Sequence, residues 1–136
     1  MRVSPHAQVL AVIAAGGGLG ATARHGMTLA WPTAAGGFPW ATFAANALGC
    51  ALIGVLMVLI TEVWAGHRLL RPFLGIGVLG GFTTFSTYAV AVRDLAAAGR
   101  PALAGAYLAG TVVAALVATW LGAVAARTLT RRPREA

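Results

Sequence analysis

Long apolar stretches without a charged residue dominate the chain, and short segments that contain arginine separate them. Read from one charge to the next, these stretches cover residues 3–23, 25–61, 72–92 and 101–126. About 20 helical residues cross a hydrocarbon layer of roughly 30 Å. The second stretch is longer, but its prolines and glycines at residues 32–39 are turn signals that place its helix at 40–61. The pattern predicts an all-α membrane protein with four transmembrane helices, approximately 5–24, 40–61, 72–93 and 101–126, in a single transmembrane domain 1–136.

Prolines and tryptophans mark the ends of these predicted helices. Pro72 and Pro101 each follow an arginine, and proline is favoured in the first turn of a helix. The four tryptophans lie near predicted ends, as is typical of residues at the lipid headgroups: Trp31, Trp40, Trp64 and Trp120. The first stretch also has the charge, apolar run and small residues of a signal peptide, which is the alternative there. Three further spans favour a retained first helix.

Composition supports a membrane protein and excludes several other classes. The chain is 59% hydrophobic and 10% charged, against about 25% charged residues in an average soluble domain. The formal net charge of +7 does not predict a nucleic-acid partner, because the arginines lie between apolar runs rather than along one face. Cys50 is the single cysteine, so a disulfide or CxxC metal framework is excluded. With no enzymatic motif, we expect a protein that is not an enzyme.

The arginines also predict an orientation in the membrane. An even number of crossings places both termini on one side, together with seven arginines: Arg2, Arg68, Arg71, Arg127, Arg131, Arg132 and Arg134. The opposite side holds Arg24, Arg93 and Arg100. Cytoplasmic loops carry an excess of Lys and Arg, so this bias predicts cytoplasmic termini.

The third span contains an unusual run of glycine and hydroxyl residues. Gly80 and Gly81 are adjacent at mid-span, followed by Thr83 and Thr84. Each interior glycine weakens a helix by about 1 kcal/mol relative to alanine, and the threonine hydroxyls can bond to the nearby backbone, so the run predicts a broken helix. A break frees carbonyls that suit a cation such as Na⁺. Close helix packing is the equal alternative, because Gly77 and Gly81 form a GxxxG pattern.

The polar residues inside the predicted spans are donors rather than ionisable groups. Asn46 lies in the middle of the second span, where it indicates either a polar path or an interhelical hydrogen bond. No Asp, Glu, Lys or Arg lies in the span interiors, so a proton relay is not expected. Amide and hydroxyl donors and the positive edges of aromatic rings favour a small anion. The residues concerned are Asn46, Phe82, Thr83, Thr84, Phe85, Ser86, Thr87, Tyr88, Tyr107 and Thr111.

Three motifs together resemble the CrcB/Fluc fluoride channels, small four-helix membrane proteins of bacteria. Residues 17–24 read GGLGATAR, residues 46–50 read NALGC, and residues 80–88 read GGFTTFSTY, the most specific of the three. The resemblance covers almost all of the chain. It implies an antiparallel dual-topology dimer with two fluoride pathways that exports F⁻ passively across the bacterial inner (plasma) membrane and lowers its cytoplasmic toxicity.

The resemblance also implies roles for individual residues. The backbone carbonyls of Gly80 and Thr83, from each subunit, would hold a central Na⁺ that is structural and not transported. Arg24 would lie in an aqueous vestibule. The fluoride pathway would be lined by Asn46, Phe85, Ser86, Thr87, Tyr88, Tyr107 and Thr111.

Two features depart from the family pattern. Tyr88 stands where the family has its second pore phenylalanine, so its phenolic O–H adds a donor and bulk. The arginine bias favours one orientation, whereas a homodimer that inserts both ways needs near balance. A heterodimer with an oppositely oriented paralogue is therefore the alternative to an antiparallel homodimer.

Two other functions compete with passive conduction of fluoride. A small proton-coupled drug exporter also has four short spans, but it needs a membrane-embedded carboxylate. An assembly subunit without transport activity would use its glycines for packing alone.

Overall fold

The chain forms a row of long helices. The computed structural model describes residues 4–63 and 68–130. Four helical runs in these ranges are long and apolar enough to cross a membrane: Pro5–Ala30, Trp40–Val63, Pro72–Ala97 and Pro101–Thr130. Their elements are α1 (Pro5–Ala30), α2 (Trp40–Val58), η1 (Leu59–Val63), η2 (Pro72–Leu79), α3 (Gly80–Phe82), α4 (Ser86–Ala97) and α5 (Pro101–Thr130). The predicted all-α architecture, with four candidate membrane-spanning helices and an interrupted third, is confirmed.

The helix ends follow local signals in the sequence. The Ser4 hydroxyl oxygen accepts a hydrogen bond from the Ala7 amide at 3.2 Å and caps α1, whose first residue is Pro5. Gly99 follows the end of α4 with φ of 73°, a left-handed conformation that glycine adopts readily. Three helix ends lie well beyond the expected bounds: α1 ends at Ala30 instead of 24, the third helix at Ala97 instead of 93, and α5 at Thr130 instead of 126. α1 continues past residue 24 to Ala30, because arginine is a good helix former and finds a carbonyl partner inside the protein.

Two segments have the wider π-helical turn, which the sequence did not indicate. They are η1, which continues α2, and η2, which opens the third helix after Pro72. Such turns are rare and are found mostly near functional sites. Here η2 leads directly into the interruption of the third helix.

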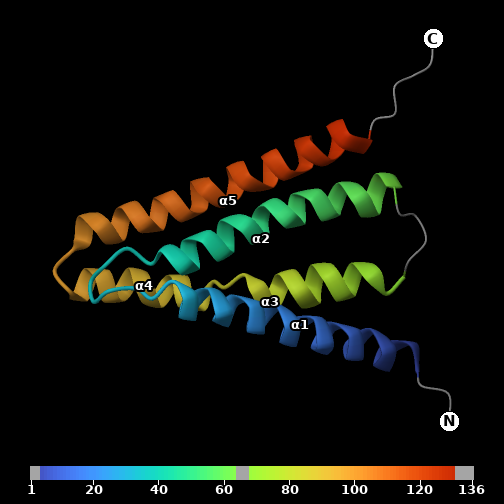
Figure 1. The fold of residues 1–136 in the computed structure, drawn as a ribbon, viewed down its shortest axis with the longest axis horizontal. Coiled ribbons are helices and arrows are strands. Elements are labelled where there is room, and N and C mark those ends of the chain that lie inside the picture. Colours follow the sequence, from blue (N-terminus) through green and yellow to red (C-terminus); the bar gives the residue numbers. More distant parts are fainter. Residues whose placement is uncertain (1–3, 64–67, 131–136) are drawn as a thin grey trace.

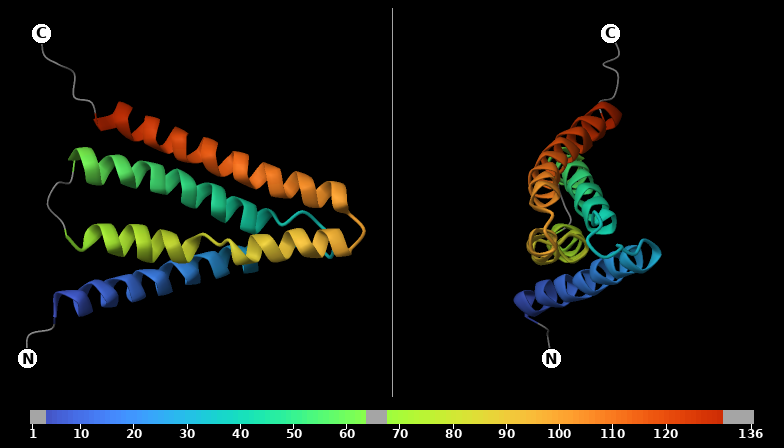
Figure 2. Two further views of the ribbon diagram at one scale, coloured as in Figure 1. Left: turned by 180° about the vertical axis from the view of Figure 1, so that it is seen from behind. Right: turned by 90° about the vertical axis from the view of Figure 1, so that its left-hand side faces the viewer.

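The interruption lets the third helix change its packing partner. In Figures 1 and 2, α5 and α1 are the outermost helices, with α2 beside α5 and the third helix beside α1. η2 and α3 pack mainly on α1, whereas α4 packs on α5. The two halves of one span therefore belong to two different helix pairs.

Glycines allow the helices in each pair to approach closely. A Cβ atom on Gly16 of α1 would lie 3.0 Å from the Val78 amide nitrogen in η2. Between α2 and α5, a Cβ on Gly54 would clash with the Thr119 carbonyl, and one on Gly122 would clash with the Ala51 carbonyl. Small residues at helix contacts are the usual basis of packing in membranes.

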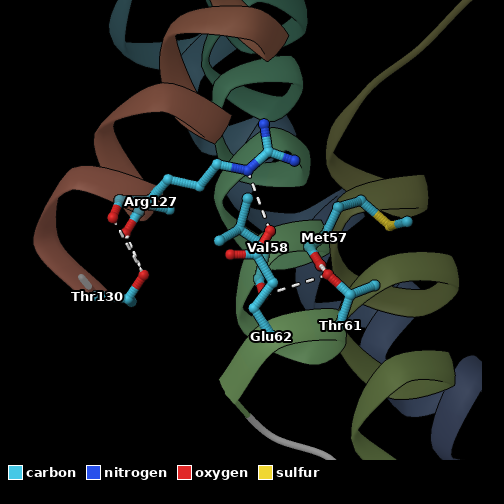
Figure 3. A network of polar contacts seen from close by, with 7 residues as sticks. Met57, Val58, Thr61, Glu62, Arg127 and Thr130 are labelled. Atoms are coloured by element: carbon cyan, nitrogen blue, oxygen red, sulfur yellow. Dashed lines mark hydrogen bonds and ion pairs between the residues drawn. The ribbon is translucent and has the colours of Figure 1, made fainter. Parts of the chain in front are cut away.

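The end of the molecule that carries the start of α1 also carries the end of α5 (Figure 1). There the Arg68 guanidinium donates a hydrogen bond to Gln8 Oε1 at 3.1 Å. Arg127 pairs with Glu62, with Nε and Oε1 3.0 Å apart, and joins α5 to η1 (Figure 3). Both side chains are about half exposed, so this pair contributes at most about 1 kcal/mol.

The described arginines are distributed as the orientation argument assumed, except for Arg24, which lies within α1. Arg93 and Arg100 lie near the end of α4 and the start of α5, at the opposite end from Arg68 and Arg127. Four other arginines of the argument and one tryptophan lie outside the described residues: Arg2, Arg131, Arg132, Arg134 and Trp64. Cytoplasmic termini remain a prediction.

Candidate functional site

The third helix is interrupted between Phe82 and Ser86. Thr83 has extended backbone, with φ of −81° and ψ of 160°, and α4 begins at Ser86. The amide and the hydroxyl of Thr83 both donate to the Leu79 carbonyl, at 3.0 and 2.9 Å, and close the end of α3. Hydroxyl groups near the backbone compete in this way with helical hydrogen bonds.

The break lies after the glycine pair and not at it. Gly80 and Gly81 are helical, and a Cβ on Gly81 would clash with the Gly17 carbonyl of α1. The predicted break in this run of glycine and hydroxyl residues is therefore confirmed, and it lies at the threonines. Both alternatives from the sequence hold at different residues: Gly81 serves packing, and the threonines form the break.

Asn46 of α2 holds the broken segment through both ends of its amide. Its Nδ2 donates to the Thr84 carbonyl at 3.0 Å, and the Thr84 amide donates to Asn46 Oδ1 at 2.8 Å. The residue is 8% exposed. Asn46 thus replaces the helical partners that Thr84 lacks, and its second N–H remains for another acceptor.

The hydrogen bonds around Thr84 release two backbone carbonyls. In an unbroken helix the Thr84 amide would donate to Gly80 and the Thr87 amide to Thr83. Instead the Thr84 amide donates to Asn46, and the Thr87 amide donates to the Thr84 hydroxyl at 3.2 Å. The carbonyl oxygens of Gly80 and Thr83 are therefore left without their helical donors. These are the two carbonyls that the family resemblance assigns to a cation.

Three hydroxyl groups gather at the start of α4. The Thr84 hydroxyl donates to Thr87 Oγ1 at 3.1 Å and lies 3.3 Å from Ser86 Oγ. Ser86 and Thr87 are exposed. The N-terminal end of a helix carries a partial positive charge, so the local field at these hydroxyls favours an anion.

A hollow of about 380 Å³ lies beside the break. It is lined by Asn46, Cys50, Gly80, Thr83, Thr84, Phe85, Tyr88, Thr111, Val112 and Ala115. Phe85 is 80% exposed, so most of its side-chain surface is uncovered at the edge of the hollow. The structure brings together Asn46, Phe85, Tyr88 and Thr111 of the predicted pathway.

Other predicted pathway residues lie apart from this hollow. Thr87 lines a second hollow, of about 320 Å³, together with Thr28, Thr42 and Asp94. Tyr107 is fully buried behind Tyr88, and its hydroxyl has no hydrogen-bond partner within the described ranges. An unpaired buried donor is costly unless a further acceptor completes it.

Two hydroxyls expected to be available as donors bind backbone carbonyls instead. Tyr88 Oη donates to the Leu108 carbonyl of α5 at 2.9 Å. Thr111 Oγ1 donates to the Tyr107 carbonyl at 2.7 Å, within its own helix. The phenol of Tyr88 therefore fixes α4 to α5, which corrects the expectation that it adds a donor to the pathway.

Changing Tyr88 to phenylalanine tests this assignment. We expect the free energy of unfolding to fall by about 1 kcal/mol, because one net hydrogen bond is lost, while ion flux stays within a few-fold of the wild-type rate. Thermal unfolding in detergent and flux from reconstituted vesicles measure the two effects. A large loss of flux at unchanged stability would instead make the phenol a pathway donor.

Arg24 approaches the break from α1. Its Nε donates to the Gly81 carbonyl at 3.3 Å, and the side chain is partly buried. The sequence placed Arg24 at the end of a span, but it lies inside α1 and bonds to the last turn of α3. Neither hollow described above has Arg24 in its lining.

The sequence analysis missed part of the lining. Cys50 lies one helical turn after Asn46 on the same face of α2, and it lines the same hollow. Ala115 is related to Thr111 on α5 in the same way. The i, i+4 spacing from a polar anchor was the signal that could have found both.

Comparison with known proteins gives the family. The family model "CrcB-like protein, Camphor Resistance (CrcB)" matches residues 11–123. The chain is 65% identical over 121 residues to fluoride-specific ion channel FluC 1 of Streptomyces coelicolor, and the match covers 89% of this chain and 79% of that protein. It is 56% identical over 126 residues to fluoride-specific ion channel FluC 2 of Nocardia farcinica, and this match covers 93% of this chain and 90% of that protein. It is 49% identical over 124 residues to fluoride-specific ion channel FluC 2 of Thermobifida fusca, and this match covers 91% of this chain and 92% of that protein. The chain belongs to the CrcB-like protein family.

Proposed function

We propose that this chain forms a fluoride-specific channel in the bacterial plasma membrane, through which F⁻ leaves the cell down its electrochemical gradient. The observation that carries the proposal is the hollow at the break, which the buried amide of Asn46 and the exposed ring of Phe85 both line. No acidic or basic side chain lines this hollow among the described residues. The names of the three relatives above support fluoride as the ion.

The chemistry of the route follows from the strong hydration of fluoride. A narrow path must replace that hydration with donors that are already in place. The free N–H of Asn46 and the exposed hydroxyls of Ser86 and Thr87 are available donors, and the buried phenol of Tyr107 is a further donor without a partner in the described residues. Phe85 adds a ring edge, which carries partial positive charge. Conduction through such a path needs no catalytic step.

A structural Na⁺ at the break is the second part of the proposal. The carbonyl oxygens of Gly80 and Thr83 lack helical donors, and free backbone carbonyls suit Na⁺. The ion would join the broken segments and would not be transported. Arg24, which binds the neighbouring Gly81 carbonyl, would hold the same segment from the α1 side.

An antiparallel dimer completes the proposed channel. Within one chain Phe85 is 80% exposed and Gly80 is exposed, so the hollow is open on one side. A second, inverted copy would close this side and add its own carbonyls to the ion site. Expression of this chain alone decides between a homodimer and a pair with a paralogue. A homodimer that conducts and inserts in both orientations excludes the need for a paralogue.

Fluoride release from reconstituted vesicles tests the function. Vesicles loaded with KF and KCl should release F⁻ and retain Cl⁻ when valinomycin lets K⁺ leave and compensates the charge. A proton-coupled exporter would instead require a pH gradient, and an assembly subunit would release nothing. Vesicles with this chain that retain fluoride would contradict the proposal.

A further inference from the structure

Aromatic rings connect the break with the segment between α1 and α2. Phe85 lies 5.7 Å from Tyr88 between ring centroids, and Tyr88 lies 5.5 Å from Tyr107. Tyr107 meets Phe38 edge to face, at 5.1 Å and 89°. Phe38 belongs to the connection 31–39, outside the membrane-spanning helices. The ring at the edge of the hollow is thus linked through two tyrosines to a connection at one end of the molecule.

The connection holds Phe38 in a defined place. Gly36 has φ of 68°, and the Arg100 guanidinium donates to its carbonyl from the start of α5. The Gly37 amide donates to the Ala34 carbonyl at 2.8 Å. The turn that carries Phe38 is therefore tied to the connection between α4 and α5.

Phe38 also contacts rings other than that of Tyr107. Its ring centroid lies 4.4 Å from that of Trp40, which stacks on Trp31 at 6.4 Å and 12°. Phe43 also contacts Phe38, at 5.6 Å. The ring of Phe38 therefore contacts three other rings, those of Tyr107, Trp40 and Phe43.

Tyr107 depends on this packing for its position. Its side chain is fully buried, and its hydroxyl has no hydrogen-bond partner in the described part of the chain. Its ring is therefore held by contacts with other side chains, among which Phe38 is the edge-to-face partner. Tyr88, by contrast, is also fixed by its bond to the Leu108 carbonyl. A change at Phe38 would act first on Tyr107 and then on the rings that it supports.

We infer that Phe38 is a positioning residue, which fixes the rings of Tyr107, Tyr88 and Phe85 and thereby sets the preference of the route for fluoride over chloride. The inference rests on the proposed fluoride conduction. Phe38 does not line the hollow at the break, so its effect would be indirect. An aromatic ring edge recognises an anion through its orientation, so a looser ring would discriminate less well.

The test compares two phenylalanines of the same cluster. Phe38→Leu removes the partner of Tyr107, whereas Phe43→Leu removes a ring that contacts Phe38 and Trp40 and has no ring contact with Tyr107 among the described residues. Both positions are partly buried against the same core. The melting temperatures of the purified variants in detergent show whether the two changes cost similar stability.

The readout is the ratio of fluoride to chloride release from vesicles. We expect Phe38→Leu to lower this ratio by several-fold, up to about tenfold, which matches the loss of one aromatic pair. Phe43→Leu should keep the ratio, and Phe38→Tyr, which retains a ring, should restore it. Equal ratios in both leucine variants would overturn the inference, provided that the wild type releases fluoride. A wild type that releases no fluoride would overturn the proposed function instead.

Discussion

Replacing Asn46 with alanine is expected to slow fluoride release by roughly a hundredfold, because two hydrogen bonds at the break disappear together. The Thr84 carbonyl and amide, bound at 3.0 and 2.8 Å, would both lose their partner. A buried polar group left unpaired costs about 1–3 kcal/mol, and about 1.4 kcal/mol corresponds to a tenfold change in rate. The substitution also removes a donor from the hollow. The initial rate of release per reconstituted protein measures the effect.

Two further variants separate the amide from the general loss of a polar group. Asn46→Asp keeps the shape and can accept from the Thr84 amide, but it cannot donate to the Thr84 carbonyl and adds a negative charge. It should be at least as slow as Asn46→Ala. Thr22→Val is the control, because the Thr22 hydroxyl bonds within α1 to the Gly18 carbonyl at 2.8 Å. Release at the wild-type rate from Asn46→Ala would exclude a role for this amide.

Gly20→Ala is expected to destabilise the protein by roughly 1–3 kcal/mol, the range for overpacking of a close contact. A Cβ at this position would clash with the Val78 carbonyl oxygen and lie 2.7 Å from the Phe82 amide nitrogen. Both are backbone atoms, so α1 would have to move away from η2 and α3. Thermal unfolding in detergent, followed by circular dichroism, measures the loss.

Gly18→Ala provides the matched control on the same helix. A Cβ on Gly18 meets nothing within 4 Å, and alanine favours a helix over glycine by about 1 kcal/mol. This variant should unfold at the wild-type temperature or above it. If both variants unfold alike, the close contact at Gly20 does not stabilise the pair of helices.

Much of the fold could be predicted from the sequence because it depends on local signals. Pro72 and Pro101 begin helices as expected, and Trp40 begins α2. The break in the run of glycine and hydroxyl residues was also predicted, but which of these residues leave the helix was not. It depends on Asn46, which contacts Thr84 from another helix, 38 residues away in the sequence. Glycine propensity alone therefore could not locate the break within the run.

The candidate site shows the same division between local and tertiary information. The sequence identified Asn46 and Phe85 by residue type, and the structure places both at one hollow. It could not show that the Tyr88 hydroxyl binds the Leu108 carbonyl, because hydroxyl groups rotate toward whichever acceptor the fold provides. The position of Arg24 was missed because a charge was taken as the end of a helix.

Because the two halves of the third span pack on different helices, the molecule consists of two packing units. η2 and α3 pack on α1 through glycine contacts, whereas α4 packs on α5 and carries Tyr88, whose ring contacts Tyr107. Thr83, which has extended backbone, connects the two units. Substitutions at Tyr88 and Tyr107 are therefore expected to alter ion preference while the glycine contacts of α1 with η2 and α3 stay in place.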